Sequence, residues 1–176
     1  LSLDHEIPDG AAMTVRDREA SRTVAVAQDR LMDAGGGKLS PYLQAPAAFI
    51  RLVEHPLFTE LGWDVANTKG YAEAYKDVIH EDAIKVGGAT KAPDYCFRIG
   101  GTRKFFLEAK KPSVDIKADA APAFQLRRYA WSAKLPLSIL TDFEEFAIYD
   151  TRVKPVKTDK PSKSRIEYFT YKDLLE

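Results

Sequence analysis

The sequence predicts an α/β domain in which a mixed central sheet is flanked by helices, with a helical extension at the N-terminus. Three observations carry this prediction. Residues 94–110 read as two alternating strands joined by Gly100-Gly101, and such a dipeptide is a strong signal for a two-residue hairpin turn. Residues 119–134 follow with apolar side chains at helical spacing. Two further apolar runs, 137–142 and 145–150, have the length and composition of strands.

The composition fits a globular protein with one main domain. Of the 176 residues, 45% are hydrophobic and 30% are charged, which is enough apolar material for a buried core. No apolar run approaches the roughly 20 residues that span a bilayer, so we expect no membrane partner. The single cysteine, Cys96, excludes an internal disulfide and suits a reducing, cytoplasmic location.

The N-terminal half is harder to interpret. Residues 14–34 have loosely helical spacing, and residues 47–61 carry an apolar helical stripe that Pro56 interrupts. Within 63–91, short strands and a helical turn fit equally well. We therefore expect three parts: a helical extension (1–40), a core (41–151), and a basic loop with a C-terminal strand or linker toward a missing downstream domain (152–176).

The charge is unevenly distributed although the net charge is zero. Residues 98–134 carry nine basic and three acidic side chains, and residues 152–165 carry six basic and one acidic. Local basic patches of this kind hold a phosphate backbone whatever the total charge. The loop 152–165 can serve as such a contact or as a solvated linker.

Glu108 and Lys110 carry the clearest chemical signal. They are two residues apart in a predicted strand, so they project from the same face. Asp94 begins the partner strand, and the hairpin turn places it near residue 107. Two carboxylates and an ammonium at one edge of a sheet suit a hydrated Mg²⁺, with Mn²⁺ as a substitute.

These residues resemble a known nuclease motif. Pro93-Asp94, thirteen intervening residues and Glu108-Ala109-Lys110 are similar to the PD-(D/E)xK motif, and Gln125 with Tyr129 resembles the Q-x-x-x-Y motif of its RecB-like branch. The run from Phe124 to Asp150 resembles the N-terminal endonuclease region of type I restriction R subunits and of type IIG restriction–modification enzymes. The resemblance implies a restriction-endonuclease-like core with strand–turn–strand–helix order.

The resemblance also implies roles for individual residues. Asp94 and Glu108 would bind the metal, and Lys110 would be the catalytic lysine. Gln125 and Tyr129 would support the site or contact DNA. Such nucleases often add a glutamate from the helix before the hairpin, and Glu54 is the best placed here. Basic side chains near the site are expected to contact the DNA backbone: Lys111, Arg127 and Arg128.

The implied function is Mg²⁺-dependent hydrolysis of phosphodiester bonds in double-stranded DNA. Methyltransferase, specificity or translocase domains would lie on the same or another chain, and two copies would meet on DNA for double-strand cleavage. The alternative is a catalytically silent nuclease-fold module for DNA binding or assembly.

Overall fold

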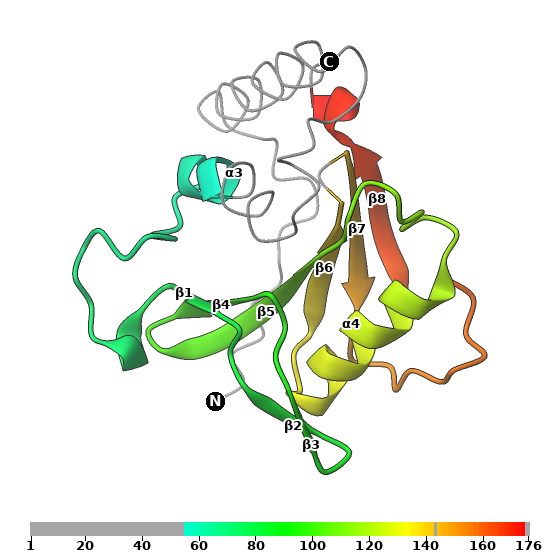
Figure 1. Cartoon of the computed structure of the whole chain (residues 1–176), viewed down its shortest axis with the longest axis horizontal. Helices are drawn as coiled ribbons and strands as arrows, with labels where there is room; N and C mark the ends of the chain where they lie inside the picture. The colour runs from blue at the N-terminus through cyan, green and yellow to red at the C-terminus, as the bar shows by residue number, and fades with distance from the viewer. Residues whose placement is uncertain (1–54, 143, 175–176) are drawn as a thin grey trace, which may run out of the picture.

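Figure 1 shows the computed structural model of the chain, which describes residues 55–142 and 144–174. The helix expected at 14–34, the whole extension 1–40 and Glu54 lie outside the described residues. Four helical segments are described: α3 (His55–Glu60), η3 (Glu73–Tyr75), α4 (Ala120–Ser132) and η4 (Tyr171–Leu174). Eight strands are described: β1 (Val78–His80), β2 (Ile84–Val86), β3 (Ala89–Lys91), β4 (Tyr95–Ile99), β5 (Thr102–Ala109), β6 (Leu137–Thr141), β7 (Glu145–Asp150) and β8 (Arg165–Thr170).

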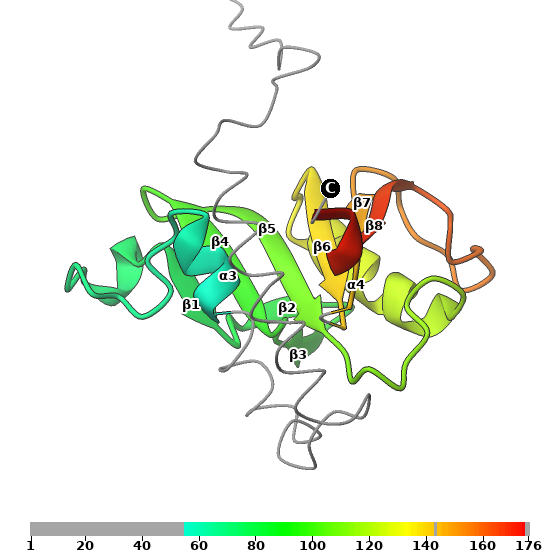
Figure 2. The ribbon, with the colours of Figure 1, turned by 90° about the horizontal axis from the view of Figure 1, so that it is seen from above.

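The fold is mixed α/β, with a mostly antiparallel central sheet. Its six strands lie in the order β1-β4-β5-β6-β7-β8, and β2 and β3 form a separate two-stranded sheet. Only β5 and β6 are parallel within these sheets. Viewed from above, β1 and β4 lie on one side of the molecule and β7 and β8 on the other (Figure 2). Because β8 pairs with β7, residues 165–170 belong to the same sheet as the site.

The β4–β5 hairpin forms where the sequence predicted it. Gly100 and Gly101 make the two-residue turn with φ of +57° and +77°, a backbone conformation that glycine adopts without steric cost. The strands pair Tyr95 with Leu107 and Cys96 with Phe106. Asp94, one residue before β4, therefore lies beside Glu108, within one residue of the predicted register.

Alternating side chains of this hairpin build two apolar clusters, one on each face of the sheet. Cys96 and Phe106 belong to the cluster that contains the buried residues of α4. Phe97 and Leu107 belong to the other cluster, which includes residues of α3. Glu108 follows Leu107 in the chain and accepts a hydrogen bond from Gln125 of α4, so the candidate site lies on the face of the sheet that α4 covers (Figure 1).

Helix α4 connects the parallel strands β5 and β6, which need a crossover of this kind. Asp119 caps its N-terminus by accepting a hydrogen bond from the Ala121 N–H at 2.9 Å. Pro122 stands in the first turn, where a missing N–H costs nothing. None of the described helices is long and apolar enough to cross a membrane.

Candidate active site on the hairpin and helix α4

Glu108 is the centre of the candidate site. The side chain is buried, with 4% of its surface exposed. Its Oε1 accepts hydrogen bonds from Lys110 Nζ at 2.7 Å and from Gln125 Nε2 at 2.5 Å. Its Oε2 is buried and has no hydrogen-bond partner among the described residues. One carboxylate oxygen is therefore fixed by the protein, whereas the other makes no hydrogen bond of normal geometry with the described residues.

Asp94 lies beside Glu108 and is held by the backbone. Its Oδ2 accepts the N–H of Ala109 at 2.8 Å, and its own carbonyl oxygen accepts the N–H of Glu81 at 3.1 Å. On the other side, the backbone N–H of Lys110 donates to the Thr141 carbonyl at 2.8 Å. The end of β5 is thus fixed on both sides, which limits the movement of the two carboxylates relative to each other.

Both carboxylates have pKa values above their usual range. Burial is the main cause for Glu108, and the nearby charge of Asp94 raises its pKa further, against the opposing effect of Lys110. Burial also raises the pKa of Asp94, while the Ala109 N–H and Lys110 oppose the rise. A cation between the two groups would relieve the cost of desolvating and juxtaposing two negative charges.

The donor set in this environment fits a divalent metal ion. Mg²⁺ is bound through one or two carboxylates and keeps several waters; Asp94 and the free Oε2 of Glu108 supply that set. Within 55–142 and 144–174, no group of three or more His, Cys, Asp or Glu side chains is placed to hold a metal ion. The protein ligands among these residues would therefore be the two carboxylates, with water completing the shell.

The other residues predicted from the sequence occupy different environments. Gln125 reaches the site, but Tyr129, one turn further along α4, is 6% exposed and packs in the apolar cluster beneath the helix. Lys111 is exposed directly after the site. Arg128 is partly buried, and its guanidinium lies over the Phe124 ring at 5.7 Å.

The prediction that Arg127 contacts the DNA backbone requires a correction. Arg127 was expected at the surface as a contact to the DNA backbone, but its side chain is 1% exposed and forms an ion pair with Asp159 at 2.9 Å. A second, longer hydrogen bond of 3.5 Å joins it to Ser164. A guanidinium buried and paired in this way ties α4 to the loop before β8 and is not available to a phosphate.

Two acidic residues near the site were missed by sequence reasoning. Glu81 follows β1 and lies next to Asp94, but a strand of three residues leaves no periodic signal. Asp142 follows β6 and is 3% exposed. Its Oδ1 accepts the backbone N–H groups of Glu144 and Glu145, and burial raises its pKa to about 7. The signal for Asp142 was its position directly after an apolar strand.

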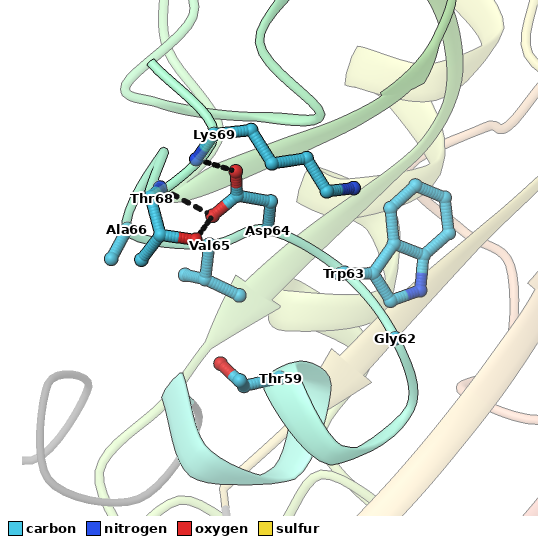
Figure 3. Close-up of a pocket in the computed structure, with 8 residues that line it drawn as sticks. All are labelled: Thr59, Gly62, Trp63, Asp64, Val65, Ala66, Thr68 and Lys69. Atoms are coloured by element: carbon cyan, nitrogen blue, oxygen red, sulfur yellow. Dashed lines mark hydrogen bonds between the residues drawn. The ribbon is translucent and has the colours of Figure 1, made fainter. Parts of the chain in front are cut away.

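A separate cavity of about 220 Å³ lies beside α3 and contains none of the site residues (Figure 3). Asp64 closes one wall by accepting hydrogen bonds from the backbone N–H groups of Thr68 at 2.6 Å and Lys69 at 2.9 Å. Trp63 lines another part and packs edge-on against Phe97 and Phe105 of the hairpin. Both carboxylate oxygens of Asp64 therefore already accept hydrogen bonds from the loop that follows it.

Comparisons with known proteins point to restriction enzymes. Residues 76–157 match the family described as the type I restriction enzyme R protein N terminus. The chain is also 46% identical over 122 residues to the type II restriction enzyme and methyltransferase RM.Eco57I of Escherichia coli. That alignment covers 68% of this chain and 12% of the relative. No solved structure matches the chain.

The family match contains every element that builds the site, from β1 to the turn after β7. Asp94, Glu108, Lys110 and Gln125 all lie within it. Residues 76–157 form a nuclease-like region of the type found at the N-terminus of restriction enzymes.

Proposed function

We propose that this chain is a Mg²⁺-dependent DNA endonuclease domain of a restriction–modification system, with a PD-(D/E)xK core. The observation that carries the proposal is the pair of carboxylates on the hairpin. Asp94 and Glu108 lie side by side, Lys110 shares the face of Glu108, and Glu108 Oε2 is buried without a partner among the described residues. The similarity to restriction-enzyme N-terminal regions supports the same conclusion independently.

Each residue has a distinct part in the proposed reaction. Asp94 and Glu108 would hold the ion, which when bound would supply an activated water and neutralise charge on the phosphate. Lys110, whose ammonium lies 2.7 Å from Glu108 Oε1, donates a hydrogen bond to the attacking water or to the developing negative charge. Gln125 fixes the rotamer of Glu108. Mn²⁺ is expected to substitute for Mg²⁺, because both accept oxygen ligands.

The proposed substrate is double-stranded DNA, and the proposed setting is a larger enzyme. The relative is named as both a restriction enzyme and a methyltransferase. Methyltransferase, specificity or translocase domains would then accompany this domain on the same or another chain, in a type I or type IIG arrangement. One site of this kind cuts one strand, so double-strand cleavage would require two copies on the DNA.

The direct test is the nicking of supercoiled plasmid DNA by the purified chain in Mg²⁺, in Mn²⁺ and in EDTA. We expect metal-dependent nicking that falls about 100-fold or more in Asp94→Asn, Glu108→Gln and Lys110→Met. Lys104→Met is the matched control, because Lys104 is an exposed lysine on the same strand. Circular dichroism of each variant separates loss of chemistry from loss of folding.

The same assay separates the endonuclease from the alternative function. A silent module for DNA binding or assembly would shift DNA in a gel but leave the plasmid supercoiled in both metals. Nicking that persists unchanged in Lys110→Met and Glu108→Gln would also contradict the proposal, since the activity would then come from elsewhere.

A further inference from the structure

Strand pairing places a third carboxylate in line with the two site residues. Strand β1 pairs His80 with Tyr95 of β4, and one residue beyond, the Glu81 N–H donates to the Asp94 carbonyl at 3.1 Å. On the other side, Tyr95 pairs with Leu107, which brings Asp94 beside Glu108. The positions of Glu81, Asp94 and Glu108 thus follow one another across three neighbouring strands, whose spacing is about 4.8 Å.

This row is unfavourable in the absence of a cation. The backbone hydrogen bond from the Glu81 N–H to the Asp94 carbonyl holds these two acidic residues at facing positions. Like charges at facing positions of a sheet destabilise it.

A separate observation indicates that a ligand belongs here. Glu108 is 4% exposed, and its Oε2 has no hydrogen-bond partner among the described residues. A buried polar atom without a partner destabilises the fold, and a cation would satisfy this one. A bound cation would therefore both contact the unsatisfied oxygen of Glu108 and reduce the repulsion between the neighbouring acids.

We propose that Glu81 is a positioning residue that accepts hydrogen bonds from the water shell of the divalent ion held by Asp94 and Glu108. No three acidic, His or Cys side chains of the described residues are placed to hold one ion directly, so Glu81 acts through water. Mg²⁺ suits this arrangement because it retains several of its waters. The inference rests on the proposed function and adds to it an acid that directly follows the edge strand β1.

The test is Mn²⁺ binding to the full chain without DNA, measured from the free Mn²⁺ signal in electron paramagnetic resonance. Removal of an outer partner of this kind weakens metal binding about 10–100-fold, and we expect that increase in Kd for Glu81→Gln. Asp94→Asn should abolish binding. Glu73→Gln is the matched control, because Glu73 is an exposed acid that pairs with Lys76 away from the site.

The outcomes separate this inference from the proposed function. If Asp94→Asn loses Mn²⁺ and Glu81→Gln binds it like wild type, the role of Glu81 is overturned while the metal site stands. If Asp94→Asn binds Mn²⁺ as tightly as wild type, both the metal site and the role of Glu81 are overturned. A 10–100-fold loss in Glu81→Gln with unchanged Glu73→Gln supports the inference, and Glu81→Asp, which keeps the carboxylate, should then retain part of the affinity.

Discussion

At the scale of single residues, the site is organised around carboxylates that the fold buries. Glu108 receives two donors on one oxygen and, among the described residues, none on the other. Asp142, one residue beyond β6, is buried as well, but the backbone N–H groups of the next turn occupy its Oδ1. The two acids therefore differ: one oxygen of Glu108 makes no hydrogen bond with the described residues and is the proposed metal ligand, whereas Asp142 shapes the β6–β7 turn.

The elevated pKa of Asp142 predicts a pH-dependent stability. Its pKa is about 7 in the folded chain, against an ordinary value of 3.8, so the folded state binds more protons between these values. Stability is then lost as the pH rises through this window. Asp142→Asn keeps the oxygen acceptor without the charge, and we expect it to raise the free energy of unfolding at pH 8 by about 1–4 kcal/mol.

Urea unfolding of Asp142→Asn and wild type at several pH values measures this effect. The difference between the two proteins should shrink toward zero near pH 3, below the ordinary pKa of 3.8, where the wild-type carboxyl is protonated in the folded state and largely so in the unfolded one. Asp173→Asn offers a comparison, because the pKa of Asp173 is lowered. A stability difference that stays constant from pH 4 to pH 8 would refute the assignment.

Gln125 is predicted to set the pH below which metal affinity declines. Gln125→Leu removes one of two donors to Glu108 Oε1, so the pKa of Glu108, already raised by burial, should rise further. Because the ion binds the deprotonated carboxylate, affinity should fall about 10–100-fold, and its decline with falling pH should begin at a higher pH than in wild type. Mn²⁺ titrations across pH check this; an unchanged profile would assign Gln125 a purely structural role.

At the scale of elements, the hairpin of β4 and β5 is the part that brings the acids together. Its turn is fixed by two glycines with positive φ. At Gly101 an added Cβ would lie 2.7 Å from the Ala74 carbonyl oxygen, whereas at Gly100 it would meet nothing. The hairpin turn is therefore packed against the segment before β1, at the end of the hairpin opposite to Asp94 and Glu108.

Gly101→Ala is expected to destabilise the chain more than Gly100→Ala. Both substitutions place a side chain at positive φ, which costs about 1–2 kcal/mol, but only Gly101→Ala forces backbone atoms apart. Thermal unfolding of the two variants measures the difference, and the larger fall in Tm should accompany weaker Mn²⁺ binding. Equal losses for both variants would mean that the contact with Ala74 does not constrain the turn.

The elements that sequence reasoning predicted are those with long, regular patterns. The hairpin, α4, β6 and β7 follow the expected ranges closely, because alternation over five or more residues or a cap such as Asp119 defines them locally. Strands β1, β2 and β3 have three residues each, too few for a period, so Glu81 could not be placed. The burial of Arg127 could not be predicted from the sequence either, since its ion-pair partner Asp159 lies in a loop 32 residues later.

At the scale of the whole molecule, basic charge lies close to an acidic centre in a chain with no net charge. In the proposed reaction the neighbouring lysines would attract the phosphates and the acids would attract the divalent ion. Lys111, exposed and directly after the site, stays a predicted phosphate contact. The division into an extension, a core and a C-terminal segment stays a prediction, although β8 joins the main sheet.

The salt dependence of DNA binding should show whether Lys111 contacts a phosphate. Lys111→Gln should weaken binding evenly across DNA sequences and reduce the slope of log K against log salt by about 1. Lys91→Gln is the control, because Lys91 is an exposed lysine on β3, in the separate small sheet. Titrations in Ca²⁺ at several salt concentrations measure both slopes, and equal slopes for wild type and Lys111→Gln would exclude the contact.

The central claim is that Asp94 and Glu108 together hold a divalent ion, and anomalous diffraction from a crystal soaked in Mn²⁺ tests it most directly. We predict a peak between the Asp94 carboxylate and Oε2 of Glu108, with Oε1 still bound to Lys110 and Gln125. The peak should be absent from Asp94→Asn crystals soaked in the same way. Soaked wild-type crystals with no density between these carboxylates, or with Mn²⁺ bound only elsewhere, would contradict the account.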